Sequence, residues 1–285
     1  MRTSTELRAL TAWFERQERV VVLLSGGVDS GVLAVAGTRA IGDQAVAVTG
    51  RSASLAADER DAIARLVLEN GICHVEVATH EGEDPAYVRN DRMRCYVCKT
   101  HLFRAAGPVA EERRAVMVTG AHVDDLGDWR PGMLAAEEAG VRAPFLELGV
   151  NKASIRSLAR ELGVDWLADK PAAACLASRI PTGTPVTPRR LSQVERFEAA
   201  LHRLGIVDVR VRHHGDTARI QVPRALAAAV LAHAEELTEL GSRLGFTYTT
   251  LDLADLRGRQ HSVGPVGSEE AGWLGSRRSS GTRAS

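Results

Sequence analysis

The sequence has no long apolar run, few cysteines and no excess charge of either sign. No stretch approaches the ~20 apolar residues of a membrane-spanning helix, and residues 1–17 lack the apolar segment of a signal peptide. Lysine plus arginine and aspartate plus glutamate both number 36, so the formal net charge is zero. This balance gives no support for a nucleic-acid or membrane partner, and we expect a cytoplasmic protein.

The pattern of apolar segments predicts the fold class. Short apolar runs at 20–24, 45–49, 74–77 and 115–119 are typical of buried strands, and segments with helical periodicity separate them. This alternation indicates an α/β fold, a doubly wound parallel sheet with helices on both faces. Ligands of such sheets bind beyond the carboxyl ends of the strands.

Beyond about residue 187 the pattern changes to α+β. We expect helices at 188–204 and 224–240, a hairpin of strands at 208–213 and 218–222, and a strand at 246–252. The Gly/Ser/Arg-rich end of the chain predicts disorder. The expected division is residues 1–183 for the first domain, 184–258 for a smaller α+β substrate or oligomerisation domain, and 259–285 for a disordered tail.

The turn after the first predicted strand carries the sequence SGGVDS, at residues 25–30. Its glycines let a ligand approach the backbone, and the N–H groups that open the next helix, expected at 28–39, favour a phosphate. Ser25 and Ser30 add hydroxyl groups. Asp29 would repel phosphate by itself, so its presence predicts a magnesium ion between the carboxylate and the phosphate oxygens.

The four cysteines, 73, 95, 98 and 175, are expected in a reducing compartment, where they serve chemistry or metal binding more often than disulfides. Cys73 lies in a predicted strand and is expected in the core. Cys95 and Cys98 form a CxxC pair, which by itself fits half a zinc site, a redox pair or two packed residues.

Cys175 follows three alanines, so a buried structural thiol is one interpretation of it. The alternative rests on its flanking residues, since Lys170, Ser178 and Arg179 would stabilise a thiolate or hold a phosphate. A thiolate beside an ATP-activating loop is a nucleophile aimed at an adenylate.

SGGVDS after a buried strand differs from the Walker loop and resembles the PP-loop of the ATP pyrophosphatases, a HUP-like fold. Further along the chain stand four more motifs, in this order: RCYVCK, GAHVDDLGDWRPG, KPAAACLASRIP and RVRHHGDTARIQ. With LLSGGVDS they identify the chain as a member of the LarE family of ATP-dependent sulfur transferases. The resemblance implies adenylylation of a carboxylate of pyridinium-3,5-biscarboxylic acid mononucleotide and its conversion to a thiocarboxylate, in nickel-pincer cofactor biosynthesis. It also implies a small-molecule nucleotide substrate and a homo-oligomer, a hexamer.

The resemblance assigns roles residue by residue. The residues that it places at ATP are Ser25, Gly26, Gly27, Val28, Asp29, Ser30, Thr49, Ser52, Gly120 and Asp125, with Asp29 also a magnesium ligand. Cys175 and Asp29 are implied as catalytic. The substrate phosphate is assigned to Ser178, Arg179, Arg210 and Arg212. Asp124, Asp128 and Arg130 are expected to line the same crevice. Departures from the family pattern at Thr182, at Gln221 and over 256–261 bear on nucleotide binding and assembly.

The number and spacing of the cysteines bear on the source of the transferred sulfur. In one type of family member the cysteine gives up its own sulfur; in the other, three cysteines hold a 4Fe–4S cluster that carries an extra sulfide. The CxxC pair favours the cluster, held by Cys95, Cys98 and Cys175, over zinc or a sacrificial Cys175.

Three other functions stay open. They are a tRNA thiolase, an amidating PP-loop enzyme, and a nucleotide-binding regulator with a structural zinc. The balanced charge speaks against the first, and the cysteines are unexplained by the second.

Overall fold

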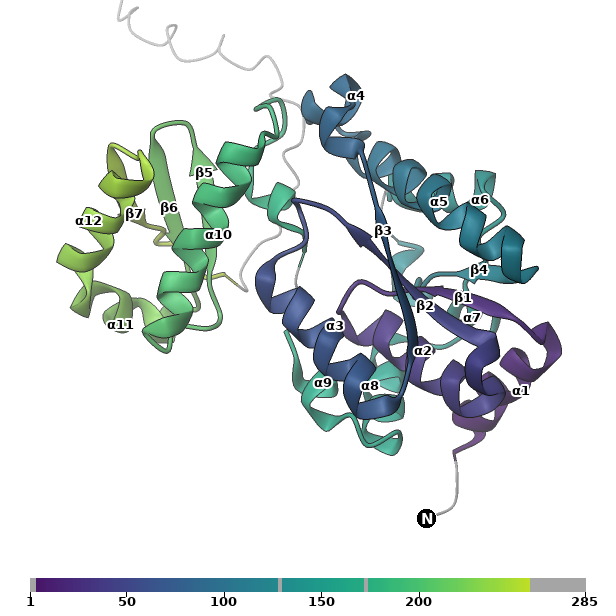
Figure 1. Ribbon diagram of the computed structural model, residues 1–285. Helices are drawn as coiled ribbons and strands as arrows, with labels where there is room; N and C mark the ends of the chain where they lie inside the picture. Colours follow the sequence, from purple (N-terminus) through teal and green to yellow (C-terminus); the bar gives the residue numbers. More distant parts are fainter. Residues whose placement is uncertain (1–3, 128–129, 172–173, 257–285) are drawn as a thin grey trace, which may run out of the picture.

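The computed structural model describes residues 4–127, 130–171 and 174–256. Its larger sheet has four parallel strands in the order β3-β2-β1-β4 (Figure 1). The strands are β1 (Val20–Leu23), β2 (Ala45–Arg51), β3 (Cys73–Ala78) and β4 (Val116–Val118). β1 is buried along its whole length, as expected for a central strand of a parallel sheet covered on both faces.

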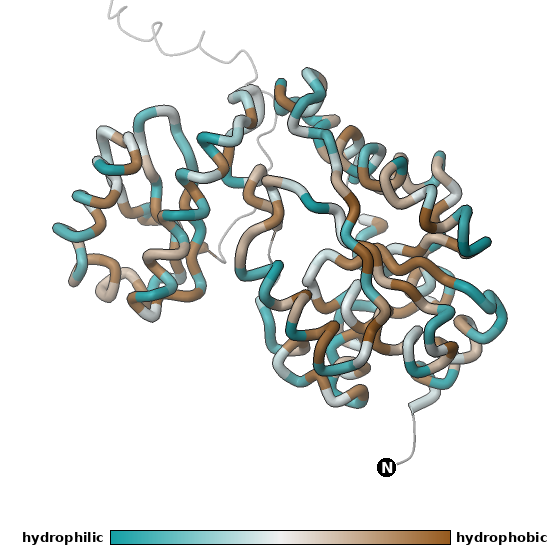
Figure 2. The backbone as a smooth tube through the Cα atoms, in the orientation of Figure 1, coloured by the Kyte–Doolittle hydropathy of each residue, from teal (hydrophilic) through white to brown (hydrophobic). Residues whose placement is uncertain are grey.

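Alternate residues of β1 point into two separate cores. Val20 and Val22 pack with α1, α2, α3, α8 and α9, whereas Val21 and Leu23 pack with α5 and α6. These helices are α1 (Thr5–Gln17), α2 (Val28–Ile41), α3 (Ala57–Asn70), α5 (Arg94–Arg113), α6 (Pro131–Glu138), α8 (Lys152–Glu161) and α9 (Asp165–Asp169). The predicted doubly wound α/β fold is confirmed, and the most hydrophobic part of the backbone runs through the sheet (Figure 2).

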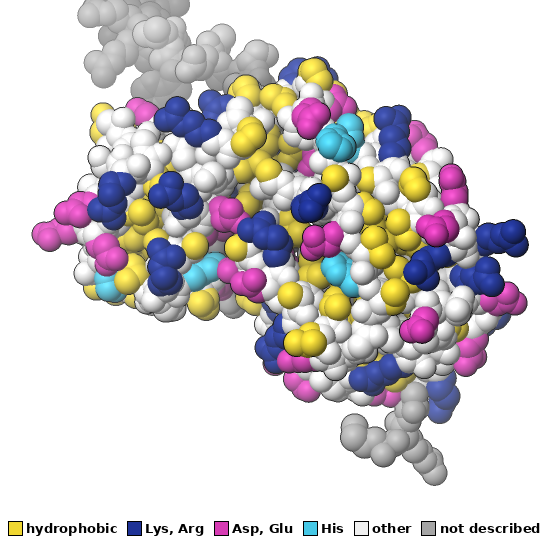
Figure 3. All heavy atoms as spheres, viewed as in Figure 1, with side chains coloured by type: hydrophobic (Ala, Val, Ile, Leu, Met, Phe, Trp, Pro, Cys, Tyr) yellow, Lys and Arg dark blue, Asp and Glu magenta, His cyan; other side chains and the backbone are white. Residues whose placement is uncertain are grey.

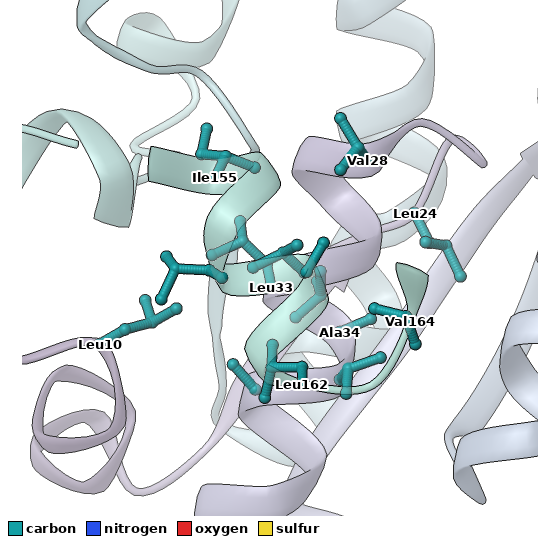
Figure 4. Packing of buried hydrophobic residues seen from close by; sticks show 14 of the residues in the cluster. Leu10, Leu24, Val28, Leu33, Ala34, Ile155, Leu162 and Val164 are labelled. Atoms are coloured by element: carbon teal, nitrogen blue, oxygen red, sulfur yellow. The ribbon is translucent and has the colours of Figure 1, made fainter. Parts of the chain in front are cut away.

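The first of these cores fixes the start of α2. Val28 and Leu33 pack beside Ile155 of α8 and Val164 (Figure 4). Burying a side chain of this size contributes about 1.5–3 kcal/mol. The packing of α2 against α8 therefore holds the turn between β1 and α2 in place.

The second part of the chain is built on a smaller sheet, β5-β6-β7. Its elements are α10 (Pro188–Arg203), β5 (Arg210–His214), β6 (Thr217–Gln221), α11 (Ala227–Ala232), α12 (Ala234–Leu244) and β7 (Tyr248–Leu251). β5 and β6 form the predicted antiparallel hairpin, and β7 lies parallel to β6. Helix α10 contacts both parts: Glu195 accepts from the Ala57 N–H at 2.9 Å and pairs with Arg60 at 3.0 Å.

Several expectations differ from the structure. The single helix expected at 224–240 is two helices with a break at His233, whose φ of −111° and ψ of 23° leave the helical range. Helix α4 (Pro85–Val88), in the polar segment 79–94, is not among the expected elements. Helix α6 and the short α7 (Pro144–Glu147), which were not expected, each begin with proline, a residue suited to the first helical position.

Two further expectations concern boundaries. The domain division at residue 183 falls between the two sheets and stays a prediction. The expected tail, 259–285, lies outside the described residues, as does Asp128. Within the described ranges no helix is long and apolar enough to span a membrane.

Candidate functional site

The PP-loop turn lies between the end of β1 and the start of α2, and its backbone is open to a ligand. Gly26 has a φ of +81°, and a Cβ there would lie 2.5 Å from Glu59 Oε2 and 2.9 Å from the Glu59 carbonyl oxygen. Only glycine fits this conformation and this contact. Gly27 is the N-cap of α2 and provides no side-chain cap. In the described part of the chain, the N–H groups of 26–30 donate no hydrogen bond, which leaves an anion site.

The two serines of the loop stabilise its shape. Ser25 N donates to Ser30 Oγ at 3.1 Å, and Ser30 Oγ donates to the Gly27 carbonyl at 3.2 Å. The Ser25 hydroxyl lies 3.2 Å from Ser30 Oγ. Ser30 is buried, as is Val28 beside it. These contacts hold the turn in one conformation, so that its N–H groups are preorganised for an anion.

Asp29 forms an ion pair that sequence analysis missed. Lys152 Nζ lies 2.6 Å from Asp29 Oδ1 and 2.7 Å from Oδ2. Lys152 is the first residue of α8, where a positive charge is disfavoured by the helix dipole. This unfavourable position of a lysine is the feature of the sequence that could have indicated a role for Lys152 outside its own helix. The Lys152 ammonium group therefore contacts the same carboxylate oxygens that we expect to bind magnesium.

The end of β4 meets the same turn. A Cβ at Gly120 would lie 2.7 Å from Asp29 Cβ and 2.9 Å from Ser30 N, so a glycine is needed for this contact. Asp125 is buried, accepts from the His122 N–H at 3.1 Å, and lies 2.6 Å from Arg130 Nη1. Gly120 is therefore brought to the PP-loop, whereas the Asp125 carboxylate is engaged with its own neighbours.

The two residues predicted at the end of β2 use their side chains within the protein. Thr49 is buried, donates to the Leu24 carbonyl at 3.0 Å and lies 2.9 Å from His74 Nε2. Ser52 Oγ donates to the buried carboxylate of Glu81. Contacts of Thr49 and Ser52 with ATP stay predictions.

Cys175 stands exposed on a turn held from several sides. It is the residue before a short 3-10 helix, Leu176–Arg179. Leu176 N donates to the Ser54 carbonyl at 2.9 Å, and Arg94 Nη1 donates to the Ala177 carbonyl at 2.8 Å. Leu176 is buried. The thiol therefore points outward from an anchored segment, which disagrees with the interpretation of a buried structural cysteine.

The CxxC pair opens α5 and lies in the electrostatic field of Cys175. Cys95 is exposed, whereas burial raises the pKa of the Cys98 thiol to about 12, with Cys175 and Cys95 contributing in the same direction. Arg94 Nη2 lies 3.9 Å from Cys95 Sγ. Cys98 packs against the cluster that contains Leu176 and Ala177, the two residues after Cys175, and thiols are the ligands that iron–sulfur centres use. The described residues contain no group of three or more side chains already arranged to hold a metal ion.

Arg179 is buried and fully engaged. Its Nε and Nη2 donate to Glu198 of α10 at 3.0 and 3.2 Å, and its Nη1 donates to the Cys175 carbonyl at 3.3 Å and to Ser178 Oγ at 3.2 Å. This guanidinium links the cysteine turn to the second part of the chain. Its role as a substrate-phosphate ligand stays a prediction.

The face of the smaller sheet carries an excess of positive charge. Arg210 and Arg212 are half-buried and flank the buried Val211 on β5, so they share one face as predicted. Arg212 Nη1 donates to the Ser178 carbonyl at 2.9 Å. Arg219 of β6 lies directly opposite Arg212, and sequence analysis missed it. Its cross-strand position on the hairpin could have revealed it.

These arginines interact with one another. Burial and then Arg210, Arg179 and Arg219 lower the pKa of Arg212, and burial followed by Arg179 lowers the pKa of Arg210. Mutually repelling guanidinium groups favour an anion among them. Elsewhere, on the face in Figure 3, basic and acidic side chains are interspersed.

Comparisons with known proteins place the site in context. The family model of the thiamine biosynthesis protein (ThiI) matches residues 15–202. An uncharacterized protein of Synechocystis sp. is 37% identical over 252 residues, 87% of this chain and 94% of its own. The pyridinium-3,5-bisthiocarboxylic acid mononucleotide synthase of Lactiplantibacillus plantarum is 32% identical over 258 residues, 89% of this chain and 92% of its own. An uncharacterized protein of Methanocaldococcus jannaschii is 28% identical over 58% of this chain and 65% of its own.

Proposed function

Because the chain belongs to the PP-loop family of the thiamine biosynthesis protein (ThiI), and within it to the LarE-type sulfur transferases, we propose that it makes a thiocarboxylate from pyridinium-3,5-biscarboxylic acid mononucleotide. The chain is an ATP-dependent enzyme of sulfur transfer that uses magnesium. The proposal places it in nickel-pincer cofactor biosynthesis, acting in the cytoplasm on a small nucleotide substrate and on no nucleic acid.

The first half-reaction takes place at the PP-loop. A substrate carboxylate oxygen attacks the α-phosphorus of ATP, and the bond to the β-phosphate breaks to release pyrophosphate. The free N–H groups of 26–30 would bind the phosphates, with Asp29 as a magnesium ligand. Lys152 would then leave Asp29 for a phosphate oxygen, because magnesium competes for the same carboxylate.

The second half-reaction takes place at Cys175. A sulfur nucleophile attacks the carbonyl carbon of the adenylate, the carbon–sulfur bond forms, and AMP leaves with the carboxylate oxygen. Arg210, Arg212 and Arg219 would bind the substrate phosphate, since each charge-assisted bond contributes about 1.5–3 kcal/mol. Arg179 would keep the turn of Cys175 in place through Glu198.

One observation carries this assignment most directly. Arg212 donates to the Ser178 carbonyl, so the arginine face of β5 lies against the turn that begins at Cys175. A phosphate-bearing substrate on this face would have its ring near the exposed thiol. A nucleotide-binding protein without sulfur chemistry would have no need to combine these two features.

The sulfur source remains a choice between two routes. Cys95, Cys98 and Cys175 would hold a 4Fe–4S cluster, and such a cluster would supply a sulfide when bound. The donor types fit this group, and the packing of Cys98 against the cluster of Leu176 and Ala177 supports a site shared with Cys175. In the sacrificial route Cys175 is itself the nucleophile and loses its sulfur. We also propose a homo-oligomer, a hexamer, on the family resemblance.

The test is anaerobic incubation of the reconstituted protein with ATP, magnesium and the pyridinium dicarboxylate mononucleotide. We expect substrate-dependent pyrophosphate release and a mass change in the substrate that corresponds to replacement of one oxygen by sulfur. Pyrophosphate release that depends on a tRNA and not on this nucleotide would contradict the proposal. Zinc in place of iron, with no ATP turnover, would support a regulator.

A further inference from the structure

Lys170 stands five residues before Cys175, yet it points toward the PP-loop. Its Nζ lies 2.7 Å from Glu59 Oε2 and 3.0 Å from the carbonyl oxygen of Gly26. The side chains of Lys170 and Glu59 are only 19% and 12% exposed. Two of the three ammonium protons therefore have acceptors within the protein, and Glu59 balances the charge. The expected roles of Lys170 in stabilising a thiolate or holding a phosphate stay predictions.

The carbonyl that Lys170 contacts belongs to the residue that shapes the loop. Gly26 has a left-handed φ of +81° and packs directly on Glu59. Gly26, Glu59 and Lys170 thus form one contact group, which we call the loop tie. It joins the PP-loop, the first turn of α3 and the start of the cysteine segment. The sequence motifs assign Gly26 to ATP and Lys170 to a thiolate or a phosphate, and they assign no role to Glu59.

The described chain is held on either side of Cys175. Before it, Arg156 of α8 donates from Nη2 to the Lys170 carbonyl at 3.3 Å, in addition to the loop tie. After it, Leu176 N donates to the carbonyl of Ser54, just before α3, at 2.9 Å. Of these anchors, only the loop tie reaches the PP-loop itself. Cys175 is therefore related to the PP-loop through Leu176, the start of α3 and the loop tie.

We propose that Lys170 is a positioning residue for the sulfur-transfer step, acting through Gly26 and Glu59. This rests on the proposed function, in which the adenylate forms at the PP-loop and the sulfur arrives at Cys175. The two half-reactions need the carbonyl carbon and the sulfur within reacting distance, and a misplacement of about 1 Å can cost on the order of 100-fold in rate. The loop tie sets that separation. Lys170 contacts the carbonyl oxygen of Gly26 and none of the N–H groups assigned to the phosphates, so we expect a smaller effect on adenylylation than on sulfur transfer.

The experiment measures both half-reactions in one sample of the full chain. Single-turnover release of pyrophosphate reports adenylylation, and thiocarboxylate formation reports sulfur transfer. For Lys170→Met we expect pyrophosphate release within about twofold of the parent, and thiocarboxylate formation slower by roughly 10- to 100-fold. Asp169→Asn is the matched control, since Asp169 is 70% exposed, precedes Lys170 and pairs with Arg160. It should leave both rates unchanged.

A second variant guards against loss of fold. Lys170→Met leaves the Glu59 carboxylate without its cation, so the double variant Lys170→Met/Glu59→Gln removes both charges together. It should also form thiocarboxylate more slowly while it releases pyrophosphate at nearly the parent rate. Its thermal unfolding midpoint should be close to that of the parent. Lys170→Arg, which keeps a charged donor, should recover part of the thiocarboxylate rate.

Three results would overturn the proposal. The first is an equal loss of both rates in the folded double variant, which would indicate a general structural role. The second is a raised KM for ATP, which would make Lys170 a nucleotide ligand. The third is unchanged thiocarboxylate formation. If the parent protein itself performs neither half-reaction, the proposed function fails instead, so the two failures are distinguishable.

Discussion

Lys152 Nζ contacts both carboxylate oxygens of Asp29, at 2.6 and 2.7 Å. The pair is 29% and 27% exposed, so solvent screens it only in part. The Lys152 ammonium group lies where a metal ion bound to Asp29 would lie. If Asp29 binds magnesium, as we propose, binding of magnesium and ATP separates Lys152 from Asp29, and this exchange is open to direct measurement.

Lys152→Met should affect magnesium and ATP in opposite directions. Without the competing ammonium, the Asp29 carboxylate of the ligand-free protein should bind magnesium more tightly. Without a lysine for the phosphates, pyrophosphate release should fall by roughly 10- to 100-fold, the value of one charge-assisted bond. Calorimetric titration with magnesium and a pyrophosphate assay give the two quantities. Weaker magnesium binding together with normal turnover would contradict this exchange.

Gly27→Val should abolish ATP use while leaving the fold intact. The nearest atom to a Cβ at Gly27 is Ser25 Oγ, at 3.9 Å, so the protein accommodates the side chain but an approaching phosphate does not. We expect pyrophosphate release to fall by at least about 100-fold with little change in the unfolding midpoint. Gly127→Val, at a position with open space, is the control. A Gly27→Val variant as active as the parent would place the phosphates elsewhere.

Arg212→Ala should raise the KM for the pyridinium substrate by roughly 10- to 100-fold and leave the KM for ATP unchanged. Arg219→Ala should act in the same direction, because Arg219 faces Arg212 across the hairpin. Arg243→Ala removes an exposed arginine of α12 and should change neither constant. Steady-state kinetics with each substrate varied decide the point. An equal rise in the KM for ATP would assign Arg212 to the nucleotide.

The three cysteine variants should behave as one unit if a cluster is present. Alanine at Cys95, Cys98 or Cys175 should each remove the broad visible absorbance of the reconstituted protein and lower its iron content. Cys73→Ala, on β3, should keep both. In the sacrificial route only Cys175→Ala is inactive. Intact-protein mass spectrometry after reaction would then show the loss of one hydrogen sulfide from Cys175, and Cys95→Ala would remain active.

Acid should destabilise the second part of the chain through His213. The residue is 3% exposed, Nε2 lies 3.1 Å from Gln193 Oε1, and Nδ1 has no hydrogen-bond partner within the described residues. Burial, and then Arg190, lowers the pKa of His213, with His214 and Arg189 acting in the same direction.

The sign of the pH effect follows. The unfolded chain binds the proton first, so stability is fully present above pH ~6.5 and is lost as the pH falls toward the lower folded pKa. The slope is at most about 1.4 kcal/mol per pH unit. His213→Gln should reduce this dependence in chemical unfolding between pH 7 and 5, and His80→Gln, at an exposed ring, should not. An identical slope in parent and His213→Gln would exclude this histidine as the cause.

The sheet and the PP-loop could be predicted because their causes are local. The five apolar residues at 20–24 suit a strand buried on both faces, and SGGVDS contains Gly26, whose left-handed backbone favours glycine. Arg210 and Arg212 share a face because side chains alternate along any strand. The break at His233 could not be predicted, because the apolar periodicity of 224–240 continues across it.

The sequence by itself therefore determined the α/β class, the glycine turn at the start of α2, and the types of residue that we propose for the chemistry. Tertiary structure alone decided which of them meet. Lys152 reaches Asp29 across 123 positions, and Lys170 reaches Gly26 across 144. Such pairings depend on how helices pack on a sheet, and no periodicity or propensity within either segment encodes the partner. The same packing also pairs Arg179 with Glu198 of α10 in the protein interior, a contact that its sequence motif does not encode.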